Sequence, residues 1–294
     1  MSTPPLSNPL RFAVIGNPIA HSRSPQIHSA FAAQLGISLT YDRLQSEPAQ
    51  FEDDVRAFFA DGGAGMNVTV PFKEAARGLC ASADEAAEFA GAVNTLAPLS
   101  GSAELGLQGY NTDGVGLVRD LEQNLGIVLR GLRVLVVGAG GAVRGALGPL
   151  LAAVQTPVVL TNRTLGRAEA LAERMRPQGE VQPLGFDELG GAGPFDLVIN
   201  GTSAGLGGRF PPIPSALGAG AWVYDMAYGD AASACLAWGR SAGARALHDG
   251  LGMLVEQAGA AFEIWHGVRP RTGPVLAELR AAQPRDPAGD PPRR

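Results

Sequence analysis

Apolar and polar positions along the first half of the chain alternate between strand-like and helix-like spacing. Five short apolar runs bounded by turn residues predict buried strands over residues 11–15, 41–44, 66–70, 91–96 and 105–107. Segments with helical spacing lie between them: one opens at Pro25, one covers 51–60 and one opens at Pro71. A chain that alternates strand and helix in this way predicts a mostly parallel sheet.

The second half begins with a helical segment over 114–125, which is expected to link two domains. Four more apolar runs predict strands over residues 133–137, 157–161, 195–200 and 221–226. Helices are expected up to about Ala153 and over 165–176, which gives the strand–helix–strand series of a doubly wound sheet. A last helix is expected over 251–265, and the Pro-rich tail over 281–294 should fray.

Length and composition support two packed domains. The 294 residues are 46% apolar and 17% charged, which is enough apolar material for two cores and too little charge for a disordered chain. The expected fold class is therefore α/β with two domains: an N-terminal α/β domain with a mostly parallel sheet and a Rossmann domain, with a cleft between them.

Charge and targeting signals exclude several classes of protein. The formal net charge of −5 gives no electrostatic reason to bind nucleic acid or an anionic membrane. No apolar run approaches the roughly 20 residues of a spanning helix, and residues 1–9 lack the layout of a secretion signal. Cys80 and Cys235 have neither disulfide nor metal spacing. We expect a cytoplasmic protein with a small-molecule ligand, and an anionic ligand would need a local basic cluster.

Lysine usage singles out one residue. Only Lys73 among the 23 basic residues is a lysine, and the others are arginines. An amine can be tuned to give and take a proton, whereas a guanidinium stays protonated. Pro71 suits a first helical turn, which places Lys73 near the positive end of a helix dipole, where an ammonium group is disfavoured. Lys73 is the candidate general acid or base, and a surface lysine retained by chance is the alternative.

Polar side chains gather around this lysine in the sequence. Asn67 and Thr69 share one face of their strand, which suggests ligand contact. Asp113 has two possible roles: N-cap of the linking helix, or a carboxylate paired with Lys73. Asn94 is either a turn residue or an amide that contacts ligand hydroxyls.

The loop before the first helix offers two serines. Ser24 precedes Pro25 and is well placed to cap that helix. Ser22 has no such duty and is the better ligand candidate. His21 lies on the same loop, but the sequence places no carboxylate beside it, so a structural role is expected.

A glycine-rich loop follows the strand over 133–137. Gly138 and Gly140 fit the first two positions of the dinucleotide fingerprint, while Val143 occupies the third. Glycines let the backbone approach a pyrophosphate, and the following helix presents free N–H groups to it. The residues expected to form this cradle are Gly138, Ala139, Gly140, Gly141 and Ala142. A glycine-rich turn without a ligand is the alternative.

The end of the next strand indicates which dinucleotide binds. NAD enzymes place an acid there for the ribose 2′-hydroxyl. This chain has Asn162, Arg163 and Thr164, with Arg167 one turn later, and no acid. Guanidinium groups suit a 2′-phosphate, so NADP is expected as the cofactor. Thr164 is also a candidate N-cap, and Thr202 either lines the nicotinamide pocket or shapes a turn.

Together these motifs resemble the shikimate dehydrogenase family. The segments that carry the resemblance run from about residue 11 to residue 275: GNPIAHSRSP, NVTVPFK, AGAVNT, NTDGVG, GAGGAVRG, NRT, NGTSAG, YDMAYG and DGLGMLVEQA. The resemblance implies NADP-linked interconversion of 3-dehydroshikimate and shikimate. It implies that Lys73 and Asp113 are the acid–base pair.

The resemblance also implies roles for the other candidates. Ligands of the substrate's carboxylate and hydroxyls would be Ser22, Ser24, Asn67, Thr69, Asn94, Tyr228 and Gln257. Asn162, Arg163, Thr164 and Arg167 would clamp the 2′-phosphate, and Met226 and Gly250 would lie beside the nicotinamide. It further implies a substrate domain of residues 1–112 with 249–294, and an NADP domain of residues 113–248.

Two other interpretations stay open at this point. An NAD(P)-dependent quinate/shikimate dehydrogenase would share Lys73 and Asp113, but an NAD enzyme should carry an acid near position 162. A non-catalytic NADP-binding sensor would have no reason to keep the lysine and the aspartate. No metal is expected, because a side chain supplies the proton. The chain is expected to be a monomer or a homodimer.

Overall fold

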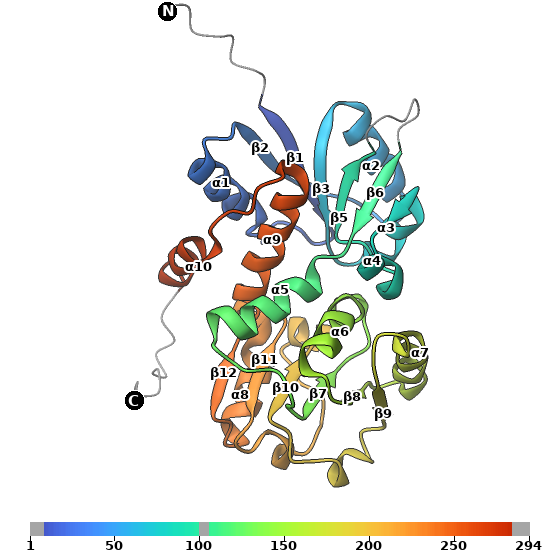
Figure 1. Cartoon of the computed structure of the whole chain (residues 1–294), viewed down its shortest axis with the longest axis vertical. Coiled ribbons are helices and arrows are strands. Elements are labelled where there is room, and N and C mark those ends of the chain that lie inside the picture. Colours follow the sequence, from blue (N-terminus) through green and yellow to red (C-terminus); the bar gives the residue numbers. More distant parts are fainter. Residues whose placement is uncertain (1–8, 100–105, 284–294) are drawn as a thin grey trace, which may run out of the picture.

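The computed structural model describes residues 9–99 and 106–283. Within them the N-terminal half forms a six-stranded sheet of order β2-β1-β3-β5-β6-β4 (Figure 1). The strands are β1 Leu10–Gly16, β2 Leu39–Gln45, β3 Gly63–Val68, β4 Ser82–Ala83, β5 Thr95–Pro98 and β6 Leu107–Tyr110. The pairs β1–β2, β1–β3 and β4–β6 are parallel, whereas β5 runs antiparallel to β3 and β6. The sheet is mostly parallel, as predicted.

Four helices accompany this sheet: α1 Ser24–Leu35, α2 Phe51–Ala60, α3 Lys73–Leu79 and α4 Glu85–Ala90. α2 shows why these segments are helical, because its buried residues Phe51, Val55, Phe58 and Phe59 recur at the spacing of one helix face. They form a core with Ala13, Ile15 and other side chains of the strands. The carboxyl ends of β1 and β3 therefore open onto the helix that begins at Lys73.

Two helical segments lie between this sheet and a second one: α5, Asp113–Arg119, with the turn that follows it, and α9, Leu251–His266 (Figure 1). α5 continues into a π-helical turn, Asp120–Asn124. It packs against α6, Gly141–Val154, and α9. A Cβ atom on Gly114 would lie 2.5 Å from the Pro149 side chain, and one on Gly116 would lie 2.7 Å from Gln257 Cβ. Glycine at both positions allows the close approach of α5 to its neighbours.

In the described residues the second sheet has six parallel strands in the order β12-β11-β10-β7-β8-β9. They are β7 Val134–Val137, β8 Val158–Thr161, β9 Val181–Leu184, β10 Leu197–Asn200, β11 Trp222–Asp225 and β12 Ala246–His248. The four residues of β7 are fully buried, as expected for a central parallel strand with both faces covered. This doubly wound sheet confirms the predicted fold class.

Five helices complete the described chain: α6 Gly141–Val154, α7 Leu165–Met175, α8 Ser233–Ser241, α9 Leu251–His266 and α10 Thr272–Ala281. Short 3₁₀ turns occupy Leu189–Gly191, Ser203–Gly207, Ser215–Gly218 and Gly229–Ala232. α9 packs its apolar face against α1, where Phe262 meets Phe31. The end of the chain thus returns to the first sheet. Among the described helices, none combines the length and apolarity that a membrane crossing requires.

The structure corrects several predicted boundaries. β3 ends at Val68 rather than at residue 70, and α3 begins at Lys73 rather than at Pro71, because a turn closed by the Phe72 N–H and the Thr69 carbonyl separates them. β5 begins at Thr95, since Gly91 ends α4 in the left-handed conformation and the chain must still turn. The strand predicted over 105–107 is β6, which starts at Leu107, and position 105 lies outside the described residues.

The sequence analysis did not predict β4, β9, β12, α4, α8 or α10. The tail that was predicted to fray covers residues 281–294. Ala281 is instead the last residue of α10, and residues 284–294 lie outside the described part of the chain.

Candidate active site

Lys73 and Asp113 meet where the two halves of the chain join. Each is the first residue of its helix, and Lys73 Nζ lies 2.5 Å from Asp113 Oδ2. Their side chains are 14% and 6% exposed. The predicted capping role of Asp113 is wrong, because Thr112 holds the N-cap position and the carboxylate is directed at Lys73 instead.

Asn94 holds the other oxygen of this carboxylate. Its Nδ2 donates to Asp113 Oδ1 and to Thr112 Oγ1, both at 2.9 Å, and its Oδ1 accepts from the Thr112 N–H at 2.9 Å. Gln257 Oε1, on α9, lies 3.4 Å from Asn94 Nδ2 and 3.3 Å from Thr112 Oγ1. Four segments far apart in sequence therefore fix one carboxylate beside one amine.

Asn67 extends this network toward α1. Its Nδ2 donates to the Asn94 carbonyl at 3.2 Å and to Thr95 Oγ1 at 3.0 Å, and its Oδ1 accepts from the Tyr41 hydroxyl at 2.6 Å. The orientation of the Asn67 amide is therefore set from both sides. Thr69 does not share a strand face with Asn67, because β3 ends between them, and its side chain is half-buried beside Gly16.

Ser22 and Ser24 form a second polar group, at the start of α1. Ser24 is buried and is the first residue of the helix, and its side chain makes no capping hydrogen bond, so the predicted cap is wrong. Ser22 Oγ instead accepts the Ser24 N–H at 3.3 Å and lies 3.2 Å from Ser24 Oγ. Burial raises the pKa of Tyr41 well above 10.0, and the Ser24 hydroxyl opposes that rise. This places Ser24 next to the Tyr41–Asn67 pair.

Tyr228 comes to the same corner from the second sheet. It follows β11 and packs partly buried against the cluster of α1 and α9 side chains that contains Ile27 and Val255. Burial raises the pKa of Tyr228, while the positive charges of Arg23 and Arg43 oppose the rise. The side chain of Tyr228 therefore lies within electrostatic reach of the serine loop.

Sequence reasoning missed two members of the network, Tyr41 and Thr112. Thr112 could have been recognised from the sequence, since it lies in the segment NTDGVG next to Asp113. Tyr41 carried only the signal of an aromatic residue in a strand, which usually means core packing. Its hydroxyl gains a role only through the register that places it beside Asn67.

The glycine loop between β7 and α6 is open where a phosphate would lie. Gly138 has φ +111°, and a Cβ there would lie 3.1 Å from Thr202 Cγ2, so only glycine fits. A Cβ on Gly140 or Gly141 would meet nothing within 4 Å. The first turn of α6 has no acidic residue and no side-chain cap, so its N–H groups are available to an anion.

The loop after β8 presents free positive charge. Arg163 and Arg167 are exposed, and within the described residues neither forms an ion pair. Asn162 Nδ2 donates to the Thr164 carbonyl at 2.9 Å and so shapes the loop. Thr164 occupies the predicted N-cap position of α7, but its side chain makes no capping bond. These groups fit a phosphate ester.

Met226 and Gly250 lie together at the carboxyl ends of β10 and β11. A Cβ on Gly250 would lie 2.2 Å from the Met226 carbonyl oxygen, and one on Gly201 would lie 2.9 Å from Met226 Sδ. Thr202 is tied to this edge through its N–H and hydroxyl, which donate to Asn200 Oδ1 at 3.1 and 2.8 Å. Open α/β sheets bind ligands at this edge.

Comparisons with known proteins agree with this arrangement. Three family models match the chain: the shikimate dehydrogenase substrate binding domain over residues 14–96, shikimate / quinate 5-dehydrogenase over 120–206, and the shikimate 5'-dehydrogenase C-terminal domain over 250–280. The shikimate dehydrogenase (NADP(+)) of Alkalilimnicola ehrlichii is 55% identical over 271 residues, which cover 92% of this chain and 98% of the relative. The chain belongs to the shikimate dehydrogenase family.

Solved structures share the fold of this chain over most of its length. An Ael1 enzyme from Pseudomonas putida matches with a TM-score of 0.84 and 42% identity, over 92% of this chain and 98% of that one. Shikimate 5-dehydrogenase from Thermus thermophilus, in complex with NADP(H) and shikimate, matches with a TM-score of 0.76 and 30% identity, over 93% and 100% of the two chains.

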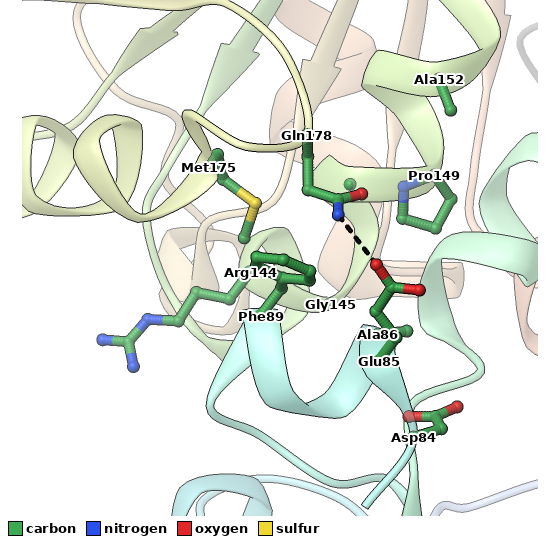
Figure 2. A pocket seen from close by; sticks show the side chains of 11 residues that line it. Asp84, Glu85, Ala86, Phe89, Arg144, Gly145, Pro149, Ala152, Met175 and Gln178 are labelled. Atoms are coloured by element: carbon green, nitrogen blue, oxygen red, sulfur yellow. Dashed lines mark hydrogen bonds between the residues drawn. The ribbon is translucent and has the colours of Figure 1, made fainter.

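This member of the shikimate dehydrogenase family also has a hollow at the contact between α4 and α6. Figure 2 shows Gln178 and Glu85 facing each other across it, with Gln178 Nε2 3.3 Å from Glu85 Oε1. Arg144, one of the residues that line it, pairs with Glu74 on α3 at 3.1 Å. None of the candidate catalytic, substrate or cofactor residues lines this hollow. The hollow therefore lies between the two halves of the chain and is separate from the candidate active site.

Proposed function

We propose that this chain catalyses the NADP-dependent, reversible reduction of 3-dehydroshikimate to shikimate. The observation that carries the proposal is the Lys73–Asp113 pair, held by Asn94 where α3, α5 and α9 meet. A chain that only sensed NADP would need the glycine loop but would have no use for an amine fixed at 2.5 Å from a buried carboxylate. Family membership at 55% identity to a curated shikimate dehydrogenase (NADP(+)) supports the choice of substrate.

NADP is the cofactor that the chain's residues fit. When bound, it supplies the hydride for the carbonyl carbon, or accepts it in the reverse direction. The open glycine loop from Gly138 to Ala142 would hold the pyrophosphate, and the loop from Asn162 to Arg167 would hold the 2′-phosphate. Thr202, Met226 and Gly250 would line the nicotinamide side of the cleft.

The proton balance falls to Lys73. As hydride adds to the carbonyl carbon, the carbonyl π electrons move to the oxygen, and the Lys73 ammonium gives that oxygen a proton. In the oxidation of shikimate, neutral Lys73 removes the hydroxyl proton instead. Asp113 orients the amine through Oδ2, and Asn94 keeps the carboxylate in place through Oδ1. We propose that Asp113 also accepts a hydrogen bond from a substrate hydroxyl.

The remaining polar side chains would hold the substrate ring. We propose that its carboxylate binds at Ser22, Ser24 and Tyr228, which converge at the start of α1. Its hydroxyls would bind nearer the amine, at Asn67, Thr69, Asn94 and Gln257. Two binding groups on either side of the Tyr41–Asn67 contact would fix the ring at both ends.

We also propose the domain division implied by the resemblance: residues 1–112 with 249–294 bind the substrate, and 113–248 bind NADP. The packing of α9 against α1 supports the return of the C-terminal segment. We further propose that the enzyme acts in the cytoplasm as a monomer or homodimer, without nucleic-acid or membrane partners; the net charge of −5 supports the last point.

The test is NADP reduction with shikimate, run in parallel with NAD and with quinate. Turnover with NADP and shikimate well above the other three pairs is the expected result. A preference for NAD or quinate would place the chain among the quinate/shikimate dehydrogenases, which accept that cofactor or substrate. Absence of turnover with every pair, together with tight NADP binding, would favour the sensor.

A further inference from the structure

The proposed carboxylate site lacks a charged ligand among its predicted residues. Ser22, Ser24 and Tyr228 are all neutral donors. A carboxylate that leaves water needs a compensating positive charge, because burying an unpaired anion is costly. Lys73 does not meet this need, since Asp113 neutralises it at 2.5 Å.

Arg43, on the edge strand β2, is placed to supply this positive charge. Its Nε and Nη2 both donate to the Ser22 carbonyl oxygen, at 2.8 and 2.6 Å. This forked contact fixes the backbone of the loop whose Ser22 hydroxyl in turn receives the Ser24 N–H. The guanidinium therefore sits against the serine pair.

The positive charge of Arg43 is not neutralised by a carboxylate of the described residues. Within the described residues no carboxylate lies within 4.0 Å of its guanidinium, and the same holds for neighbouring Arg23. Both charges oppose the effect of burial on the pKa of the Tyr228 hydroxyl, whereas Asp249 adds to that effect. Two positive charges thus lie between the serine loop and the tyrosine that reaches it from the second sheet.

We propose that Arg43 makes the enzyme prefer substrates whose ring carries a carboxylate. This proposal rests on the function proposed above. It acts in two ways: its fork holds Ser22 and Ser24 in position, and its uncompensated charge attracts the carboxylate that they bind. Arg43 is a positioning and specificity residue rather than a catalytic one. It takes no part in the transfer of the proton or the hydride.

The test compares shikimate with its methyl ester, which lacks the negative charge. For Arg43→Gln we expect the KM for shikimate to rise by about 10- to 100-fold, as for loss of a charge-assisted contact, with little change in kcat. The KM for the ester should rise by less than that for the acid, because only the loss of the fork affects the ester. Arg43→Lys keeps the charge but not the fork, so it should retain most of the preference for the acid over the ester. Arg56→Gln, an exposed arginine on α2, is the matched control.

Calorimetric binding of both compounds to wild type and variants gives the same comparison without turnover. If wild-type protein fails to oxidise shikimate, the proposed function fails, but acid-over-ester binding that depends on Arg43 would still support the inference. Equal losses for acid and ester would show that Arg43 only holds the loop and would overturn the proposal. An unchanged KM in Arg43→Gln would overturn it as well.

Discussion

The proton-transfer region and the cofactor region of this enzyme are built in opposite ways. Around Lys73 and Asp113 the polar side chains are buried and bonded to one another. Around Gly140, Gly141 and Arg163, the groups that would bind a ligand are exposed or open. The first region is therefore organised before any ligand arrives, whereas the second leaves its contacts to be made by the dinucleotide.

This difference separates the expected effects of mutation. A change in the preformed region disturbs groups that act on the reacting atoms, so it should appear mainly in kcat. A change in the open region removes a contact made equally in ground state and transition state, so it should appear mainly in the KM for the cofactor. The predictions below test this separation.

The largest effect is expected from Lys73→Ala. Loss of the proton donor should lower kcat by about 1,000-fold, within the range for general acid–base catalysis, while the KM for shikimate changes only a few-fold. Lys73→Arg is the control: it keeps a cation beside Asp113 and therefore the ion pair, but it cannot exchange the proton. Stopped-flow and steady-state measurements of NADPH formation test both variants. Full activity in Lys73→Ala would remove this lysine from the chemistry.

A smaller effect is expected in the cofactor region. The double change Arg163→Ala, Arg167→Ala should raise the KM for NADP by about 100-fold, since two charge-assisted contacts are lost, and should leave the KM for NAD nearly unchanged. Arg176→Ala, an exposed arginine at the other end of α7, is the control. Equal losses for NADP and NAD would show that these arginines do not read the 2′-phosphate.

The same contrast explains what the sequence could predict. The cofactor features are contiguous: the glycine loop lies between β7 and α6, and Arg163 follows β8 directly. A short motif therefore carried both its structure and its chemistry. The substrate network joins Asn94 to Gln257 across 163 positions, and no spacing rule reaches that far. Asn67, Asn94 and Asp113 were candidates from their local sequence, whereas Gln257 came only from the family resemblance.

Errors in the prediction have local causes. Ser24, and Asp113 in one of its two possible roles, were expected to cap helices, but each is the first helical residue. Ser24 Oγ lies 3.2 Å from Ser22 Oγ, and Asp113 Oδ2 lies 2.5 Å from Lys73 Nζ. The strands β9 and β12 were missed because they are short edge strands with half-buried residues, which leave no apolar run in the sequence. Central strands such as β7 are fully buried and were easily recognised.

Burial of a titratable side chain next to the proton-transfer region should make the stability of the protein depend on pH. His28 is fully buried against Tyr41, and burial followed by the charge of His266 lowers its pKa to about 3 from 6.5. Between these values the unfolded state binds a proton that the native state excludes, so the native state loses stability as pH falls. The loss from this residue should reach about 2 kcal/mol between pH 7 and pH 5.

Urea unfolding of wild type and His28→Phe across that pH range tests the prediction. The variant keeps an aromatic ring against Tyr41 but cannot titrate, so its stability should fall less steeply with pH than that of the wild type. Groups remote from His28 titrate alike in both proteins and cancel in the comparison. Parallel curves for the two proteins would mean that His28 does not resist protonation.

The smallest effect tests how finely the preformed region is set. Tyr41→Phe removes the hydroxyl that donates to Asn67 Oδ1 at 2.6 Å and leaves that buried oxygen without a donor. We expect a loss of about 1 kcal/mol in the free energy of unfolding, as is typical for one hydrogen bond. The freed amide can rotate away from Thr95, so the KM for shikimate should rise by about 5-fold, while the KM for NADP stays constant.

Tyr110→Phe provides the control for this change, since within the described residues the Tyr110 hydroxyl makes no hydrogen bond. Steady-state kinetics and urea unfolding on the two variants separate the roles of the hydroxyls. A lower stability with an unchanged KM would make Tyr41 a purely structural residue, and the Asn67 amide would then be oriented by Asn94 and Thr95 alone. A rise in the KM for NADP as well would contradict the separation of the two regions, because it would show that disorder around Asn67 reaches the cofactor loop.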